Sequence, residues 1–149
     1  MKRNSRLSLA LHTLSHMAND PDRMRTSADI ADHAGTNPVV VRRVLGKLRE
    51  AGLLSSEKGH AGGWRLAQAP DGITLADVYL ALGDRLVSGN INEDDPSPCH
   101  VEEGLQARLA EVLNDVEASL VERLRETTIV DVHPKSCSFC DSSDASISR

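Results

Sequence analysis

Apolar residues recur every three or four positions over residues 5–19, which predicts an amphipathic first helix. Ser27 is well suited to cap a short second helix over residues 28–34. Asn37 then caps a third helix that starts at Pro38, where the missing N–H costs nothing. Two short helices joined by a tight turn, the second of them basic, are typical of a helix-turn-helix.

Two runs with strand character follow, at residues 53–57 and 64–67, on either side of a glycine-rich loop. Three helices followed by such a hairpin indicate a winged helix. Thr74 and Asp77 form a capping box, which predicts a fourth helix that ends near residue 82.

Residues 101–126 carry the longest helical pattern, with one apolar stripe along it. Part of this stripe can pack within the chain, but a small winged helix exposes too little surface to cover all of it. Pairing with the same helix of a second chain is the more economical arrangement and predicts a homodimer. Thr128 and Asp131 form a second capping box, which predicts one more short helical turn. The positions assigned to the dimer interface are Leu105, Leu109, Val112, Val116, Leu120 and Leu124.

These elements predict a mainly α-helical fold with a small β-hairpin. We expect a winged helix-turn-helix over residues 1–82, an acidic linker over 83–98 and a dimerisation helix region over 99–134. Residues 135–149 contain six serines, and we expect this tail to be disordered.

The charge is divided unevenly between the two halves of the chain. The first 65 residues hold 11 Lys/Arg and 6 Asp/Glu, a net of +5, whereas the remainder holds 6 and 16, a net of −10. The overall charge of −5 argues against a nucleic-acid partner, but phosphate binding depends on local basic surface. We therefore expect the first half to face double-stranded DNA and the acidic half to face away from it.

Composition excludes several other classes of protein. Trp64, Tyr79 and Phe139 are the only aromatic residues, too few for a single-strand binder that stacks bases. The longest stretch without Asp, Glu, Lys or Arg is 13 residues, too short to cross a bilayer. Three cysteines are too few for a secreted disulfide scaffold, so we expect a cytoplasmic protein. The sequence has no P-loop or nucleophile motif, and we predict that the chain is not an enzyme.

The third helix and the hairpin loop supply the candidate DNA contacts. The first turns of a recognition helix reach base edges in the major groove, where arginine can bind guanine and valine can touch a thymine methyl. Lys47 lies further along and is expected to reach phosphate, while the loop can approach the minor groove or phosphates. The alternative to DNA contact is that the basic side of the third helix is simply solvated. Trp64 is expected to anchor the wing in the core. The candidate DNA-binding residues are Ser27, Asn37, Val39, Val40, Arg42, Arg43, Lys47, Lys58, His60, Gly62 and Arg65.

The cysteines leave three roles open. Cys137 and Cys140 have the spacing of a zinc-binding pair, and Cys99 with a histidine such as His133 would complete four ligands. They can equally act as redox-active thiols or have no role. The acidic residues around Cys99 favour the protonated thiol, although the start of the following helix works against that.

Four segments of the chain, residues 26–31, 41–54, 59–66 and 73–77, resemble the Rrf2 family of bacterial transcription regulators. The family includes an iron–sulfur cluster regulator, a nitric-oxide-sensing repressor and a cysteine-metabolism repressor. The resemblance covers about residues 5–132, and its most specific parts are the wing and the helix before it.

The resemblance implies a dimeric winged-helix protein that binds palindromic operators, usually as a repressor, with the long helix forming the dimer. Cluster-binding members carry three cysteines, with five residues between neighbours, before that helix. Cys99 stands alone in this region, so the chain looks like the cluster-free branch and no iron–sulfur cluster is expected. The resemblance places base recognition on Asn37, Val39, Arg42 and Arg43, and minor-groove contact on Lys58 and His60.

We therefore predict a sequence-specific, homodimeric transcription regulator. One alternative is a thiol-based redox sensor or oxidoreductase that uses Cys99 or the Cys137 and Cys140 pair. A thioredoxin-like enzyme would place that pair beside a βαβ unit, which the sequence pattern does not contain. A second alternative is a winged helix used only for protein contacts.

Overall fold

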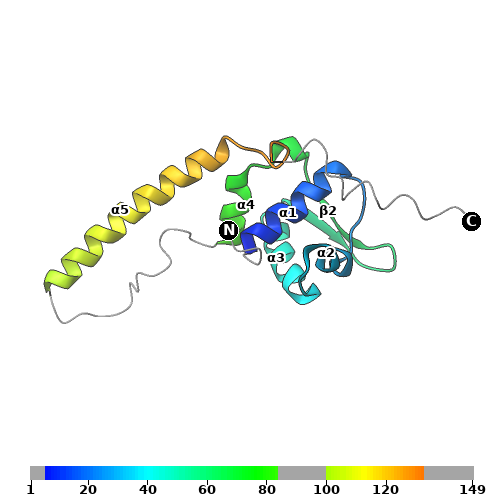
Figure 1. Cartoon of the computed structure of the whole chain (residues 1–149), viewed down its shortest axis with the longest axis horizontal. Coiled ribbons are helices and arrows are strands. Elements are labelled where there is room, and N and C mark those ends of the chain that lie inside the picture. The colour runs from blue at the N-terminus through cyan, green and yellow to red at the C-terminus, as the bar shows by residue number, and fades with distance from the viewer. Residues whose placement is uncertain (1–5, 84–99, 133–149) are drawn as a thin grey trace, which may run out of the picture.

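The computed structural model describes residues 6–83 and 100–132, and Figure 1 shows their arrangement. Within these residues the chain forms five α-helices, one short 3-10 helix and one antiparallel hairpin, which confirms the predicted fold class. In chain order the elements are α1 (Arg6–Asn19), α2 (Ser27–Ala34), α3 (Pro38–Glu50), β1 (Leu54–Glu57), β2 (Gly63–Leu66), η1 (Pro70–Gly72), α4 (Leu75–Leu82) and α5 (His100–Arg125).

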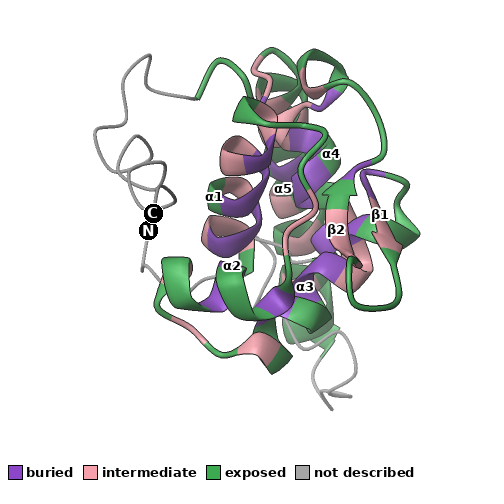
Figure 2. Cartoon of the chain, turned by 90° about the vertical axis from the view of Figure 1, so that its right-hand side faces the viewer, coloured by how far each residue is buried: buried purple, intermediate pink, exposed green. Residues whose placement is uncertain are grey.

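The core lies between α1, α3, α4 and the hairpin. Figure 2 shows the buried parts of these helices turned inward. The predicted apolar stripe of α3 is fully buried, because Val41, Val44, Leu45 and Leu48 all face this core. Burying that stripe fixes which side of α3 remains at the surface.

The start of α3 matches the sequence prediction, and the start of α2 does not. Asn37 caps α3, with its side-chain oxygen 2.7 Å from the backbone nitrogen of Val39. The cap of α2 is Thr26 and not Ser27. Thr26 and Asp29 form a reciprocal capping box, which satisfies two backbone donors where a serine one position later would satisfy fewer.

The hairpin has a third backbone partner that the sequence did not reveal. Residue Arg25, in the connection between α1 and α2, forms a two-way bridge with Trp64 of β2, with N···O distances of 3.0 and 2.8 Å. The neighbouring Gly63 allows this approach, because a Cβ there would lie 2.7 Å from the Arg25 carbonyl oxygen. The base of the wing is thereby fixed to the helix-turn-helix.

The chain after α5 returns to the core. The backbone of Ile129 donates to Ile73, Leu75 donates to Thr127, and the Ile129 side chain is fully buried. Thr128 and Asp131 make the predicted capping hydrogen bonds. The predicted short helical turn corresponds to a turn over residues 129–132, which follows the backbone bridge between Thr128 and Thr74.

Helix α5 packs against α4 near its C-terminal end and extends away from the winged helix toward its N-terminus (Figure 1). The buried Glu117 carboxylate accepts a hydrogen bond from the Tyr79 hydroxyl of α4. The predicted linker beyond Gly83 and the predicted tail lie outside the described residues. No described helix is both long and apolar enough to cross a membrane.

Candidate nucleic-acid interface

The exposed side of α3 presents the residues predicted to contact bases. Val39 is 56% exposed, and Val40, Arg42 and Arg43 also lie at the surface. Among the described residues, neither arginine forms an ion pair. Guanidinium groups without a carboxylate partner can reach an acceptor on a ligand without first breaking a salt bridge.

Asn37 serves the helix as well as the candidate interface. Its side-chain oxygen is used by the cap of α3, which leaves the amide nitrogen as the group that can donate to DNA. The cap also holds the first turn of α3, where a recognition helix meets base edges.

The wing lies next to α3 and is joined to it through Arg49. The Arg49 guanidinium donates to the Ser56 hydroxyl of β1 at 3.1 Å and lies 5.9 Å from the centre of the Trp64 ring. This contact links the wing to α3. This contact could not be predicted from the sequence, because it depends on how the hairpin packs against α3.

The tip of the wing carries two of the predicted contacts, Lys58 and His60, both exposed. The turn is closed by a hydrogen bond from the Gly62 nitrogen to the Gly59 oxygen at 3.0 Å. Arg65 lies on the adjacent strand, where it forms an ion pair with Glu57 at 3.0 Å. Both partners of that pair are half exposed, so a phosphate can compete with Glu57 for the guanidinium.

Two residues predicted to contact DNA form hydrogen bonds within the protein. The Lys47 ammonium donates to the Leu82 carbonyl at the end of α4, at 2.5 Å, and the residue is half-buried. Ser27 is 9% exposed, and its hydroxyl accepts a hydrogen bond from the Trp64 indole at 2.9 Å. Lys47 therefore supplies a donor to a backbone carbonyl at the C-terminus of α4. Ser27 helps to hold the Trp64 side chain, which anchors the wing as expected.

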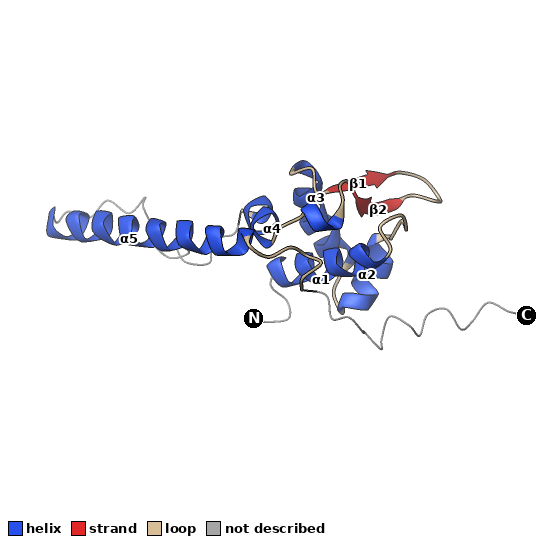
Figure 3. Ribbon diagram, turned by 90° about the horizontal axis from the view of Figure 1, so that it is seen from above, coloured by secondary structure: helices blue, strands red, loops and turns tan. Residues whose placement is uncertain are grey.

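The predicted dimer stripe on α5 is exposed over its first half. Leu105 is 67% exposed and Leu109 is 47% exposed, while Leu120 and Leu124 are half-buried near α4. Val112 and Val116 are also exposed. The helix and the wing lie at opposite ends of the molecule (Figure 3). The N-terminal end of α5 is therefore remote from the wing.

The candidate redox or metal residues Cys99, Cys137, Cys140 and His133 lie outside the described residues, so the part of the chain that the structure describes offers no thiolate ligand. Their proposed roles stay predictions.

Comparison with known proteins agrees with this geometry. Residues 3–135 match the Rrf2 family, which is described as an iron-dependent transcriptional regulator. The chain is 35% identical over 130 residues to YwnA of Bacillus subtilis, whose name places it among the HTH-type transcriptional regulators; the match covers 87% of this chain and 95% of YwnA.

Two solved structures are similar to the fold. A crystallised chain described as a DNA-binding protein superposes with a TM-score of 0.68 and 33% identity, covering 86% of this chain and 98% of its own. The cysteine regulator CymR of B. subtilis, 21% identical, gives a TM-score of 0.61 over 92% of this chain and 99% of CymR. These relatives are transcription regulators and not enzymes. The chain belongs to the Rrf2 family of transcriptional regulators.

Proposed function

We propose that this regulator binds a palindromic operator as a homodimer and acts as a repressor. The observation that carries the DNA-binding part is the exposed face of α3 with Arg42 and Arg43, together with the exposed Lys58 and His60 of the wing. A helix in the major groove and a wing beside it can contact bases and backbone together.

The homodimer is supported by the exposed apolar side chains along α5. A row of leucines and valines in water favours association with an equally apolar surface, and a second copy offers the same row. Two recognition helices held about 34 Å apart would match two half-sites one DNA turn apart. A palindromic operator follows from that two-fold symmetry.

We propose that it acts without an iron–sulfur cluster, although the family description names iron. Only Cys99 lies in the region before α5, and a cluster needs three or four good ligands. Anaerobic reconstitution with iron and sulfide should therefore leave the purified protein colourless. Stoichiometric iron and sulfide that remain after desalting would overturn this part of the proposal.

The experiment that tests the function is selection of bound fragments from a random duplex DNA pool, followed by binding measurements on the selected sequence. We expect Arg42→Ala and Arg43→Ala to lose about 1–3 kcal/mol of binding and to relax the base preference at the positions they read. Arg108→Ala is the matched control, because Arg108 is an exposed arginine on α5 paired with Glu111.

Selection of no common sequence would contradict the proposal, as would equal affinity of wild type and both α3 variants for the selected duplex.

A further inference from the structure

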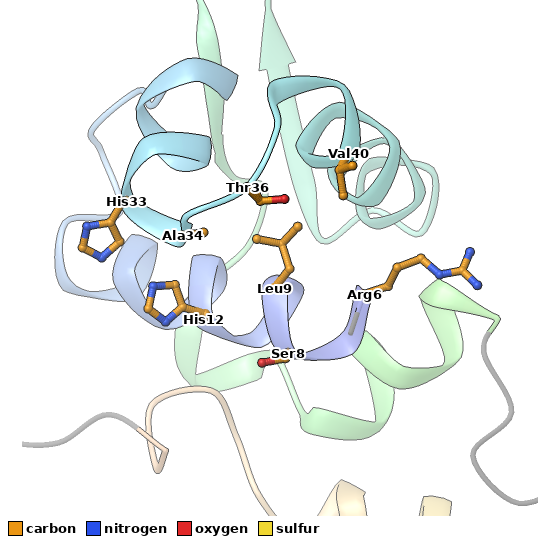
Figure 4. A pocket seen from close by; sticks show the side chains of 8 residues that line it. All are labelled: Arg6, Ser8, Leu9, His12, His33, Ala34, Thr36 and Val40. Carbon is orange, nitrogen blue, oxygen red and sulfur yellow. The ribbon is translucent and has the colours of Figure 1, made fainter. Parts of the chain in front are cut away.

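Three histidines from two helices meet on one side of the winged helix. His12 and His16 are one turn apart on α1, and His33 lies in the last turn of α2. Ligand-capable atoms of the three side chains all lie within 4.8 Å of one another, and the Nε2 atoms of His16 and His33 are 3.0 Å apart. Figure 4 shows His12 and His33 projecting side by side from α1 and α2.

The rings are packed closely but remain reachable from solvent. The ring centres are separated by 4.4 to 5.2 Å, and His12 and His33 are exposed while His16 is half-buried. Burial and the neighbouring His33 lower the pKa of His12, which favours its neutral form. A neutral imidazole is the form that binds a metal ion.

The donor set suits a borderline divalent transition ion. Zn²⁺ binds imidazole nitrogen at about 2.0–2.1 Å with tetrahedral geometry, which places neighbouring ligand nitrogens roughly 3.4 Å apart. The ligand-capable nitrogens of the three histidines lie between 3.0 Å and 4.8 Å apart, close to that distance. Rotation of the exposed rings of His12 and His33 can therefore bring the three nitrogens onto one ion. Two histidines at i and i+4 on one helix face form a frequent part of such sites.

Two charged side chains at this place already have partners, whereas the buried Thr13 hydroxyl and the Arg25 Nε have none among the described residues. Asp29 caps α2 through Thr26, and the Arg25 guanidinium donates to the His16 carbonyl at 3.4 Å. An open hollow of about 320 Å³ borders His12 and His33 and has room for a water molecule in the fourth position. The hollow is also lined by Arg6, Ser8 and Thr36 (Figure 4).

We propose that His12, His16 and His33 form a binding site for a divalent transition-metal ion such as Zn²⁺. The ion joins α1 to α2, the helix that precedes the recognition helix. None of the three ligands lies on the exposed face of α3 or in the wing, although Val40 of α3 lines the same hollow. Because the folded chain brings together ligands from two helices, metal binding stabilises the fold.

Zinc titration followed by calorimetry tests the site on the full-length chain. All variants carry Cys99→Ser, Cys137→Ser and Cys140→Ser, because free thiolates also bind zinc. We expect one ion per chain. His12→Ala, His16→Ala or His33→Ala should each weaken zinc affinity at least about tenfold, because losing a residue that only hydrogen-bonds a metal ligand already lowers metal affinity by about that factor. His60→Ala and His100→Ala are the matched controls and should bind as the parent does.

A second measurement covers any variant that fails to fold. In the cysteine-free parent, Zn²⁺ should shift the ring signals of His12, His16 and His33 in NMR spectra and leave those of His60 and His100 in place. It should also raise the melting temperature, whereas Mg²⁺ should not. Absence of stoichiometric binding, shifts confined to other histidines, or unchanged affinity in all three folded variants would overturn the proposal. None of these readouts requires DNA, so the outcome is independent of the proposed function.

Discussion

At the scale of single residues, Gly62 is the position where the wing tolerates least change. A Cβ there would lie 2.3 Å from the Glu57 carbonyl oxygen and 2.9 Å from the Lys58 carbonyl carbon. Both are backbone atoms of the same turn, so the turn must open to admit a methyl group.

Gly62→Ala should therefore lower the free energy of unfolding by about 1–3 kcal/mol, the usual cost of overpacking. Urea denaturation measures this change. Gly104→Ala is the matched control, because no atom lies within 4 Å of its added Cβ and alanine favours a helix interior by roughly 0.5–1 kcal/mol. Equal stability of the Gly62 variant and wild type would show that the turn is less constrained than these contacts indicate.

His12 should make stability depend on pH in a defined direction. Its pKa in the folded chain is below the ordinary 6.5, because of burial and the nearby His33. Between the two pKa values the unfolded chain holds more protons, so the free energy of unfolding falls as pH falls through 6.5. In metal-free buffer, denaturation at a series of pH values should show this slope, and His12→Asn should reduce it.

Asp131 provides a separate pH window that distinguishes the two groups. Hydrogen bonds from the Thr128 backbone and hydroxyl lower the pKa of Asp131 below 3.8, so its contribution is lost only in more acidic solution. An unchanged slope near pH 6.5 in His12→Asn would assign that dependence to other groups.

The residue roles that could be predicted from the sequence are those whose partners are near in sequence. The Asn37 cap and the Thr74 capping box depend on contacts two or three residues away, and both were predicted. Lys47 bonds Leu82, and Ser27 bonds Trp64, across more than 30 residues. Only the tertiary fold brings those groups together. Spacing and charge alone therefore predicted DNA contacts for Lys47 and Ser27 and not these intramolecular hydrogen bonds.

At the scale of elements, the segment after α5 combines a local signal with tertiary pairing. Thr128 and Asp131 make the hydrogen bonds of a capping box, and residues 129–132 form a turn. Ile129 enters the core, and its backbone pairs with Ile73. Burial of this large apolar side chain stabilises the segment, because a single helical turn is costly to nucleate on its own.

Ile129→Ala should therefore destabilise the protein by about 2–5 kcal/mol, through lost burial and the cavity left behind. Chemical denaturation followed by circular dichroism measures the change. Val130→Ala is the matched control, because its side chain is exposed and its loss should change stability by less than about 0.5 kcal/mol. Similar effects of the two substitutions would contradict the assignment of Ile129 to the core.

At the scale of the whole molecule, α5 has two parts with different roles. Near its C-terminal end the buried contact between Glu117 and Tyr79 holds it to α4. Its first half exposes the stripe that includes Leu105 and Leu109. The sequence predicted this division in outline, since the stripe was too long for the winged helix to cover, but not the buried carboxylate that fixes the helix.

In the homodimer proposed above, Leu109→Glu should favour the monomer, because a charge in an apolar interface must be desolvated without a partner. Sedimentation equilibrium measures the mass directly. Ala107→Glu places the same charge on the opposite side of α5, at an exposed position, and should leave the dimer intact. A wild-type chain that sediments as a monomer, or equal masses for both variants, would contradict the role proposed for the stripe.

Binding of duplex DNA by the basic face of α3 and the wing is tested most directly by the salt dependence of the affinity. For the selected duplex, the logarithm of the association constant should fall linearly with the logarithm of salt concentration, with a slope of about −0.9 for each neutralised phosphate. Lys58→Ala should make the slope shallower by about 1, and Arg108→Ala should not change it. An affinity that does not respond to salt, or one that responds alike in Lys58→Ala and wild type, would contradict the account.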